Sequence, residues 1–300
     1  MTKIAVIFPV FNGLAYTKKC LKALFTLFGE QKNNSFHFDV IIVDDGSSDG
    51  TGDWIKENYP QVKLLHGNGD LWWSGGINMA LKAGMEEMGT DYFVWWNNDI
   101  IPASDYFGNL TAIINKYSAG TVIGSKIYLD ENFNTIWSMG GMFNVKNGFK
   151  SMIGTGLADE PKFQVPQPCD WLTGMGTVTH RSVYEKIGML DEKKFPQYHG
   201  DADFTLRAKL AGFEVIAVPE LKIYNDTRHS GLKHDESFSR LWKSLFSIRS
   251  NFNIKKDFEF YNKHVTSIMA YKVPALKYLS YIGGYFKWKF LGFFGKKRPS

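Results

Sequence analysis

The segment that decides the fold is residues 40–51, with the sequence VIIVDDGSSDGT. Four branched apolar residues stand before two aspartates, and small turn-forming residues follow them. A short apolar run bounded by turn formers is typical of a strand buried on both faces of a parallel sheet. The two aspartates then lie at the carboxyl end of that strand, where open α/β sheets bind their ligands. The segment therefore predicts an α/β fold with a binding site at one edge of its sheet.

Apolar runs and amphipathic segments alternate along the first half of the chain. We expect strands at residues 4–8, 40–43, 62–65 and 92–96. We expect helices at residues 15–28, 53–58 and 75–88, and later at 181–187 and 203–211. This is the pattern of βα units that form a Rossmann-like, mixed but mostly parallel sheet flanked by helices. Each strand then ends in a polar loop on the same edge of the sheet.

The composition is that of a folded protein. The chain has 300 residues, of which 44% are hydrophobic, enough for one substantial core with a small appendage. Cys20 and Cys169 are the two cysteines and lie far apart, which excludes a disulfide framework and a thiolate zinc cluster. The apolar run at the N-terminus is too short for a signal peptide, so we expect a first strand and a cytoplasmic protein.

A second polar segment is WWNNDI, residues 95–100, in which an apolar strand ends at a triplet holding one carboxylate. Asp99 at such a strand end is well placed to bind a hard divalent cation, which would neutralise a diphosphate. A single aspartate makes a poor metal site, and in isolation a solvated loop acid is equally plausible. Further ligands are therefore required.

A third segment is HGDADFTLRAKLAGF, residues 199–213, which places Asp201 and Asp203 just ahead of an expected helix. A carboxylate at a helix start is fixed by the N-terminal amides and can face a cleft, as a general base requires. Helix capping alone explains one of the two aspartates, but explains both less easily.

In this order, the three segments resemble the family 2 inverting glycosyltransferases of the GT-A fold. The resemblance covers about residues 3–230. The matching motifs are Pro9-Val10-Phe11-Asn12, the Asp44–Asp49 loop, Asn97-Asn98-Asp99, and Asp201-Ala202-Asp203 with Arg207. The segment from Gly67 to Gly76 also resembles members that act on rhamnose-type or galactofuranose-type donors. The resemblance implies transfer of one sugar from a UDP- or dTDP-sugar to an acceptor hydroxyl, in synthesis of a bacterial surface glycan such as O-antigen or capsule.

The resemblance also implies a role for individual residues. Asp201 is the expected general base, and Asp99 with His229 is expected to bind Mn²⁺ or Mg²⁺. The residues expected at the nucleotide sugar are Pro9, Phe11, Asn12, Asp45, Gly76, Asn78 and Asn98. The residues expected at the acceptor are Trp171, Gly174 and Asp203, although a packed core tryptophan is an equally good interpretation of Trp171.

Two departures from the family pattern concern the metal and the base. Asn97 and Asn98 stand where many relatives carry further aspartates, which predicts a lower metal affinity. Gly200 stands where the usual glutamate precedes the catalytic aspartate. These departures are the features that favour a non-catalytic module binding a nucleotide sugar or a lipid. A sugar nucleotidyltransferase is a further alternative, but the N-terminal region has no glycine-rich basic loop for a triphosphate.

We expect the catalytic domain to span residues 1–235, with a nucleotide-sugar half at about 1–120 and an acceptor half at about 121–235. Residues 236–300 are expected to form a helical, aromatic and basic extension. From residue 260 onward there are eight Lys or Arg and no acid, which leaves 27 basic and 30 acidic residues in the body of the chain. That acidic balance argues against a nucleic-acid partner.

The extension has no uninterrupted apolar stretch of about 18 residues, so it is not expected to span a bilayer. An amphipathic helix of this composition would lie in an anionic headgroup layer at the inner membrane face, which suits a lipid-linked saccharide or glycan acceptor. The alternative is that its aromatic residues pack on the catalytic domain or on a second subunit, as in a homodimer.

Overall fold

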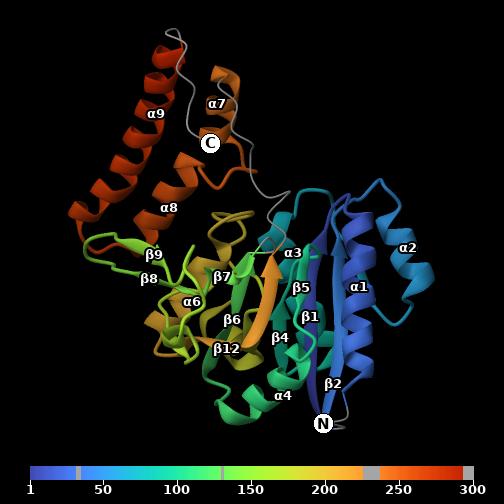
Figure 1. The fold of residues 1–300 in the computed structure, drawn as a ribbon. Helices are drawn as coiled ribbons and strands as arrows, with labels where there is room; N and C mark the ends of the chain where they lie inside the picture. The colour runs from blue at the N-terminus through green and yellow to red at the C-terminus, as the bar shows by residue number, and fades with distance from the viewer. Residues whose placement is uncertain (32–34, 130–131, 226–236, 293–300) are drawn as a thin grey trace. The chain divides into compact units, whose positions relative to one another are not determined.

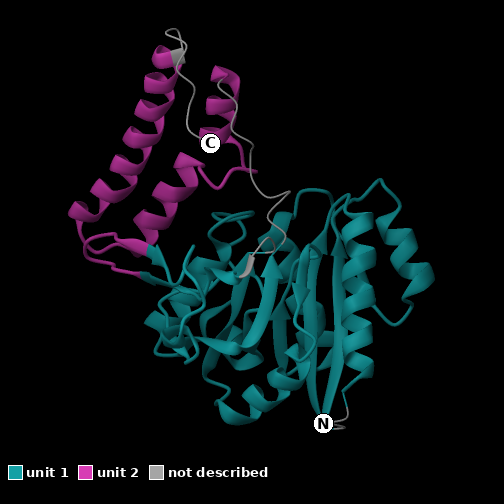
Figure 2. Ribbon diagram, viewed as in Figure 1, with its two compact units in different colours: residues 1–142, 151–228 teal, residues 143–150, 229–300 magenta. Residues whose placement is uncertain are grey.

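The computed structural model describes residues 1–31, 35–129, 132–225 and 237–292 (Figure 1). The chain divides into two compact units (Figure 2). Unit 1 comprises Met1–Met142 and Ser151–Arg228, and unit 2 comprises Phe143–Lys150 and His229–Ser300. A loop from the middle of the sequence therefore joins the C-terminal unit, a long-range association that no local sequence pattern indicates.

Unit 1 is built on one mixed sheet. Its strand order is β10-β12-β6-β11-β4-β1-β2-β3, with β5 paired to β12 and β7 paired to β6. The strands are β1 (Thr2–Val10), β2 (Phe36–Asp44), β3 (Lys63–His66), β4 (Tyr92–Trp95), β5 (Ile100–Pro102), β6 (Thr121–Leu129), β7 (Asn132–Ser138), β10 (Gln167–Pro168), β11 (Val178–His180) and β12 (Glu214–Asn225). β1 runs parallel to β2 and β4, and β2 runs parallel to β3. β11 is antiparallel to β4 and β6. The expected mostly parallel sheet is confirmed.

The register of β1 and β2 explains how the first two loops of the site meet. The two strands pair from Thr2 with Phe36 through to Val10 with Asp44. The chain therefore leaves both strands at the same level, and the main-chain N–H of Asp45 donates to the carbonyl of Val10 at 2.9 Å. The loop after β1 and the loop after β2 start side by side.

Two apolar cores lie on the two faces of this sheet. Ile4, Val6 and Phe8 of β1 belong to the first core, together with residues of α1 (Leu14–Gly29) and α4 (Tyr106–Lys116). Ala5 and Ile7 belong to the second core, together with residues of α3 (Trp72–Ala83), α5 (Arg181–Ile187) and α6 (Gly200–Leu210). The alternation follows from the two-residue period of a strand. It explains why the apolar runs of the sequence are continuous.

Three expected boundaries differ from the structure. The third helix, α3, begins at Trp72, and a π-helical turn continues it over Gly84–Met88. The N-cap of α2 (Thr51–Asn58) is Gly50, because Asp49 turns back to accept from the N–H of Thr51 at 3.1 Å. α6 begins at Gly200, because His199 adopts a left-handed conformation with φ of 68° at the N-cap. Asp201 and Asp203 therefore lie inside the first turn of this helix.

Unit 2 contains α7 (Phe238–Phe246), α8 (Ile254–His264), a 3₁₀ turn at Ile268–Tyr271 and α9 (Lys272–Gly292). It also contains the tip of the hairpin formed by β8 (Gly141–Phe143) and β9 (Lys150–Met152). The ring of Phe143 packs edge-on against Phe260 of α8. Tyr261 of the same helix donates its hydroxyl to the carbonyl of Gly148 at 2.7 Å. In the described ranges, no helix is both long enough and apolar enough to cross a bilayer.

Candidate active site

The loops that carry the expected site residues meet at one edge of the unit 1 sheet. β1, β2, β3 and β4 are parallel, so the loops that follow them leave from the same edge, at the top of unit 1 in Figure 1. β11 is antiparallel to β4, so the segment that enters it, Thr173–Thr177, reaches the same edge. The sheet topology thus brings segments more than 150 residues apart in sequence to one place.

Asp45 fixes the loop that follows β3. Its Oδ1 accepts from the N–H of Gly69 at 2.8 Å, and its Oδ2 accepts from the N–H of Leu71 at 2.9 Å and of Trp72 at 3.0 Å. Each carboxylate oxygen can accept two hydrogen bonds, so Oδ1 retains one acceptor position. The buried carboxylate is therefore first an anchor for the start of α3, with capacity for one further donor such as a base N–H.

Phe11 and Asn12 lie on the surface above this edge. The Asn12 side chain accepts from the N–H of Ser48 at 2.8 Å, and the Asn12 N–H donates to the hydroxyl of Ser47 at 3.0 Å. These bonds join the loop after β1 to the loop after β2. The ring of Phe11 is exposed and available to a planar ligand.

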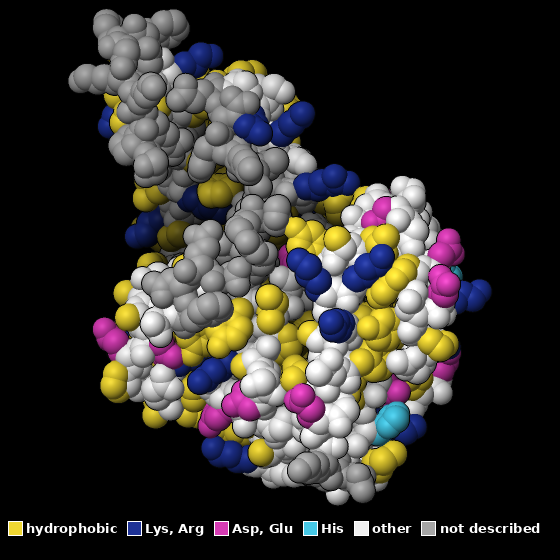
Figure 3. All heavy atoms as spheres, turned by 45° about the vertical axis from the view of Figure 1, so that its right-hand side comes forward, with side chains coloured by type: hydrophobic (Ala, Val, Ile, Leu, Met, Phe, Trp, Pro, Cys, Tyr) yellow, Lys and Arg dark blue, Asp and Glu magenta, His cyan; other side chains and the backbone are white. Residues whose placement is uncertain are grey.

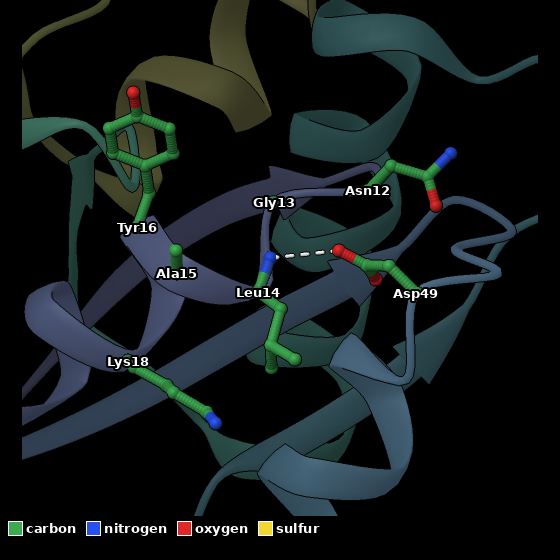
Figure 4. Close-up of a pocket in the computed structure, with 7 residues that line it drawn as sticks. All are labelled: Asn12, Gly13, Leu14, Ala15, Tyr16, Lys18 and Asp49. Atoms are coloured by element: carbon green, nitrogen blue, oxygen red, sulfur yellow. Dashed lines mark hydrogen bonds between the residues drawn. The ribbon is translucent and has the colours of Figure 1, made fainter.

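A pocket of about 400 Å³ opens beside these loops at the start of α1 (Figure 4). Its lining residues are Asn12, Gly13, Leu14, Ala15, Tyr16, Lys18 and Asp49. Asp49 accepts from the N–H of Leu14 at 3.0 Å, the bond drawn in Figure 4. Burial raises the pKa of Asp49, but hydrogen bonds from Thr51 and Leu14 outweigh it and hold the pKa below its usual value. Of the expected site residues, Asn12 lines this pocket.

The triplet after β4 is held from two sides. Asn97 accepts through Oδ1 from the indole N–H of Trp73 at 3.0 Å. Asn98 donates through Nδ2 to the hydroxyl of Thr17 in α1 at 3.0 Å, and it lies so close to Gly13 that a Cβ there would be 2.7 Å from Nδ2. Asn98 therefore joins the Asn97–Asp99 triplet to the loop that carries Asn12.

Asp99 is half-buried beside α1. Burial raises the pKa of the Cys20 thiol to about 12, and the negative charge of Asp99 adds to that rise. Asp99 and the carbonyl oxygen of Asn98 are hard oxygen donors of the kind that Mg²⁺ and Mn²⁺ accept. Among the described residues no group of three or more His, Cys, Asp or Glu could hold a metal ion. A cation at the triplet would therefore need further ligands from outside the described residues.

Trp73 is a site residue that the sequence interpretation missed. Its indole N–H binds Asn97, and its ring covers Gly174 so closely that a Cβ there would lie 2.4 Å from the indole Cζ2. The same ring packs edge-on against Trp95 in β4 at 5.7 Å between centroids. Trp73 thus joins the Asn97–Asp99 triplet to the segment before β11. The sequence feature that could have indicated Trp73 is the position of the Trp72-Trp73 pair within the glycine-rich segment from Gly67 to Gly76.

Asp201 is tied to the same segment. Its Oδ2 accepts from the N–H of Gly174 at 2.8 Å, and its Oδ1 accepts from the N–H of Ala202 at 2.8 Å. Two main-chain donors therefore fix the orientation of the carboxylate. Together with the Trp73 contacts, these bonds link Asp201 to Asn97 through Gly174 and one indole ring.

Asp203, which we expected at the acceptor, lies in the protein interior beside Arg207. It is fully buried, and Arg207 donates to its Oδ2 at 3.0 Å. The other two nitrogens of Arg207 donate to the carbonyls of Ile187 and Met189, each at 2.8 Å. Asp203 therefore orients an arginine that fixes the chain after α5, beneath the site.

Asn78 and Gly76 of α3 also serve packing in the structure. The Asn78 amide binds the main chain of Leu190 in both directions, at 2.9 and 3.0 Å, and donates to Glu192 at 2.7 Å. Gly76 is buried, and a Cβ there would lie 2.5 Å from Cβ of Pro9. Gly76 and Pro9 thus let α3 lie close to β1, and the expected contact of Gly76 and Asn78 with the nucleotide sugar stays a prediction.

Trp171 is 6% exposed, and its ring covers Gly141, with its indole N–H directed to the carbonyl of Met142 at 3.3 Å. This packing leaves little ring surface for a sugar.

A Cβ at Gly200 would lie 2.2 Å from the hydroxyl of Ser74, so the glutamate usual at this position has no room against α3. His229, the second expected metal ligand, lies outside the described residues.

Three non-glycine residues in the described chain have positive φ, namely Asn12 at 50°, Trp72 at 57° and His199 at 68°. Asn12 follows β1, Trp72 is the first residue of α3, and His199 is the N-cap of α6. Such conformations cost about 1–3 kcal/mol each and persist where the surroundings impose them. All three positions border the segments of the candidate site.

The surface of unit 1 shown in Figure 3 carries acidic, basic and hydrophobic side chains side by side. No continuous basic track covers that face of the described residues, and such a track is the usual feature of a nucleic-acid partner.

Comparison with known proteins gives the same fold and a family. The model of Glycosyl transferase family 2 matches residues 5–188. An N-acetylglucosaminyl-diphospho-decaprenol L-rhamnosyltransferase of Mycobacterium tuberculosis is 26% identical over 208 residues, which are 64% of this chain and 67% of that protein. The glycosyltransferase GlyA of Streptococcus pneumoniae serotype 4 is 28% identical over 131 residues, 43% of this chain and 18% of that protein.

Two solved structures share the architecture. GalNAc-T7 with UDP, GalNAc and Mn²⁺ has a TM-score of 0.57 at 13% identity, over 87% of this chain and 54% of that one. TarS 1-349 of S. aureus in complex with UDP-GlcNAc has a TM-score of 0.51 at 16% identity, over 88% of this chain and 72% of that one. At these identities the likeness shows the fold, and the expected GT-A fold is confirmed.

Proposed function

The chain belongs to glycosyl transferase family 2, and on that premise we propose that it is a metal-dependent, inverting transferase of one sugar. The donor is a UDP- or dTDP-sugar, and the acceptor is a hydroxyl of a lipid-linked or polysaccharide intermediate of a bacterial surface glycan, such as O-antigen or capsule. The name of the mycobacterial relative supports a rhamnosyl donor and a lipid-linked acceptor.

The observation that carries the proposal is the connected set of contacts from Asp201 to the Asn97–Asp99 triplet, which holds the expected metal ligand. Gly174 binds Asp201, the Trp73 ring covers Gly174, and the Trp73 indole N–H binds Asn97. The expected base and the expected metal loop therefore belong to one packed assembly.

In the proposed reaction, Asp201 takes the proton of the acceptor hydroxyl as its oxygen attacks the anomeric carbon. The new carbon–oxygen bond forms on the face opposite the breaking bond to the diphosphate, so a single displacement inverts that carbon. The N–H groups of Gly174 and Ala202 hold the Asp201 carboxylate in place before and after it receives the proton. A divalent cation held by Asp99, with His229 as a proposed second ligand, would neutralise the charge of the departing diphosphate.

The remaining proposed contacts concern the donor. Phe11 and Asn12 would flank the base, Asp45 would accept one N–H from it, and Asn98 would face the diphosphate. These proposals rest on the exposure of Phe11 and on the one acceptor position left on Asp45.

The test is release of nucleoside diphosphate from a panel of UDP- and dTDP-sugars, with and without Mn²⁺. For Asp201→Asn we expect kcat to fall by about 10²–10⁴ with little change in donor binding, because the variant cannot accept the proton. Asp53→Asn, an exposed acid in α2, is the matched control. Near wild-type turnover of Asp201→Asn would remove this residue from the chemistry.

A further inference from the structure

The longest helix of unit 2 among the described residues, α9, carries apolar side chains on two opposite sides. On one side, Tyr278, Tyr281 and Tyr285 pack against Leu241 and Leu245 of α7. The hydroxyl of Tyr278 donates to Asp257 of α8 at 2.7 Å, and that of Tyr281 donates to Ser244 of α7 at 3.0 Å. The tyrosines of the tail therefore belong to the core of unit 2.

The opposite side of α9 is apolar and exposed. Its members are Leu276 at 59%, Leu279 at 68%, Phe286 at 54% and Phe290 at 63% exposure. At 100° per residue these four positions fall within one narrow strip of the helix surface, and 14 residues at 1.5 Å give the strip a length of about 21 Å. We call this the outer strip. Gly283 lies within it, and no atom lies within 4 Å of the position of a Cβ there.

Basic side chains accompany the outer strip. At 100° per residue, Lys272 falls within the strip and Lys287 at its margin, and both side chains are exposed. From residue 260 to the end of the sequence there are eight Lys or Arg and no acid. A surface that combines leucine, phenylalanine and lysine meets the requirements of a lipid interface, where rings and aliphatic chains enter the acyl boundary and ammonium groups meet phosphates.

We propose that the outer strip of α9 docks the protein on an anionic lipid surface, with the helix lying in the plane of the interface. Two other occupants fit less well. A second copy would bring an equally basic tail against this one, and a nucleic acid would use the lysines but leave the leucines in water. The inference deepens the proposed function, since a lipid-linked acceptor would then lie in the surface to which the enzyme is bound.

The experiment is flotation of the full chain with vesicles of phosphatidylcholine alone and with phosphatidylglycerol added, without nucleotide sugar or acceptor. We expect binding to the anionic vesicles that weakens as salt is raised, because the lysine contribution is screened. In Leu279→Gln/Phe286→Gln, the partition coefficient on anionic vesicles should fall by about tenfold or more, as two apolar side chains no longer enter the lipid. Lys272→Gln/Lys287→Gln should weaken binding and reduce its salt dependence.

The matched control is Val165→Gln/Leu210→Gln, which replaces two equally exposed apolar side chains of unit 1. This control should bind vesicles as the wild type does, and all variants should keep the wild-type unfolding temperature. Equal vesicle partitioning of the outer-strip variant and the wild type would overturn the proposal. So would a wild-type dimer that the outer-strip variant abolishes, in the absence of vesicle binding.

Because no sugar is transferred in this assay, its outcome is separate from that of the proposed function. A protein that binds vesicles but transfers no sugar would uphold the docking face and contradict the proposed reaction. A protein that transfers sugar to a water-soluble acceptor but binds no vesicle would uphold the proposed reaction and contradict the docking face.

Discussion

Substitution of Gly174 by alanine tests the contact on which the candidate site depends. A Cβ at Gly174 would lie 2.4 Å from Cζ2 and 2.6 Å from Cη2 of Trp73, distances at which something must move. The indole is restrained by its bond to Asn97 and by the edge contact with Trp95. Either the ring moves and the Asn97 bond breaks, or the main chain moves and the N–H of Gly174 withdraws from Asp201.

The magnitude follows from these contacts. Overpacking a well-packed site costs about 1–3 kcal/mol, and losing a hydrogen bond to a charged group costs about 1.5–3 kcal/mol. A shift of about 1 Å in a catalytic group lowers turnover by about 10²-fold. We therefore expect Gly174→Ala to be destabilised by about 2–4 kcal/mol and to lose about 30- to 100-fold in kcat, with a smaller change in donor KM.

The assay is steady-state release of nucleoside diphosphate, with denaturant unfolding of the same samples. Gly108→Ala is the matched control, since Gly108 is an exposed residue in α4 whose Cβ would meet nothing nearer than 3.8 Å. The double variant Gly174→Ala/Trp73→Phe adds a second test, because the smaller ring makes room for the methyl group. The two changes should then be less than additive. Wild-type kcat and stability for Gly174→Ala would refute the reasoning.

Three further predictions concern residues that hold the site or its surroundings. Arg207→Lys should lower the free energy of unfolding by about 2–4 kcal/mol, because lysine cannot reproduce the three bonds of the guanidinium to Asp203 and two carbonyls; an unchanged denaturation midpoint would contradict this. Asp45→Asn should raise the donor KM by about tenfold and make the loop before α3 more sensitive to limited proteolysis, since an amide nitrogen cannot accept from main-chain N–H groups. Burial lowers the pKa of His180, whose neutral ring accepts from the N–H of Ser182, so stability should be full above pH 6.5 and fall as the pH drops toward the folded-state pKa. Urea unfolding of wild type and His180→Asn at about pH 5 and pH 7.5 checks this, and the same pH dependence in both would contradict it.

Local pattern predicted the parallel part of the sheet well. The apolar runs that become β1, β2 and β4 are buried on both faces of the sheet. A continuous apolar run in the sequence therefore corresponds directly to a buried strand. α5 has the expected bounds, 181–187, because it begins after a strand and ends at Gly188, which has a positive φ of 77°. In such segments each residue's conformation follows from its near neighbours.

The candidate site was less predictable, because its packing is set by residues distant in sequence. Asn78 and Asp203 are polar residues in the right motifs, yet one holds Leu190 and the other orients Arg207. Trp73 reaches Gly174 across a hundred residues, a contact that helical or strand periodicity does not encode. Motif spacing thus located the loops, while the division into supporting and ligand-facing side chains required the fold.

The C-terminal extension, residues 236–300, also has side chains whose placement the sequence pattern did not predict. Its sequence is aromatic and basic throughout, and the alternatives of packing and membrane contact both fitted it. The structure packs Tyr278 and Tyr281 inside unit 2 and leaves Leu279 and Phe286 exposed. The hydroxyls are bonded to neighbouring helices, which explains why the tyrosines take the inner side.

We propose that the loops carrying Asp45, Asp99 and Asp201 meet around one binding site for a cation and an activated sugar. The most direct measurement is a crystal structure with Mn²⁺ and UDP, with the manganese located by its anomalous scattering. We predict one strong anomalous peak within bonding distance of the Asp99 carboxylate, with the diphosphate beside it and Asp201 facing the side on which the sugar would lie. A manganese–nucleotide complex bound at any other edge of the molecule would contradict the account.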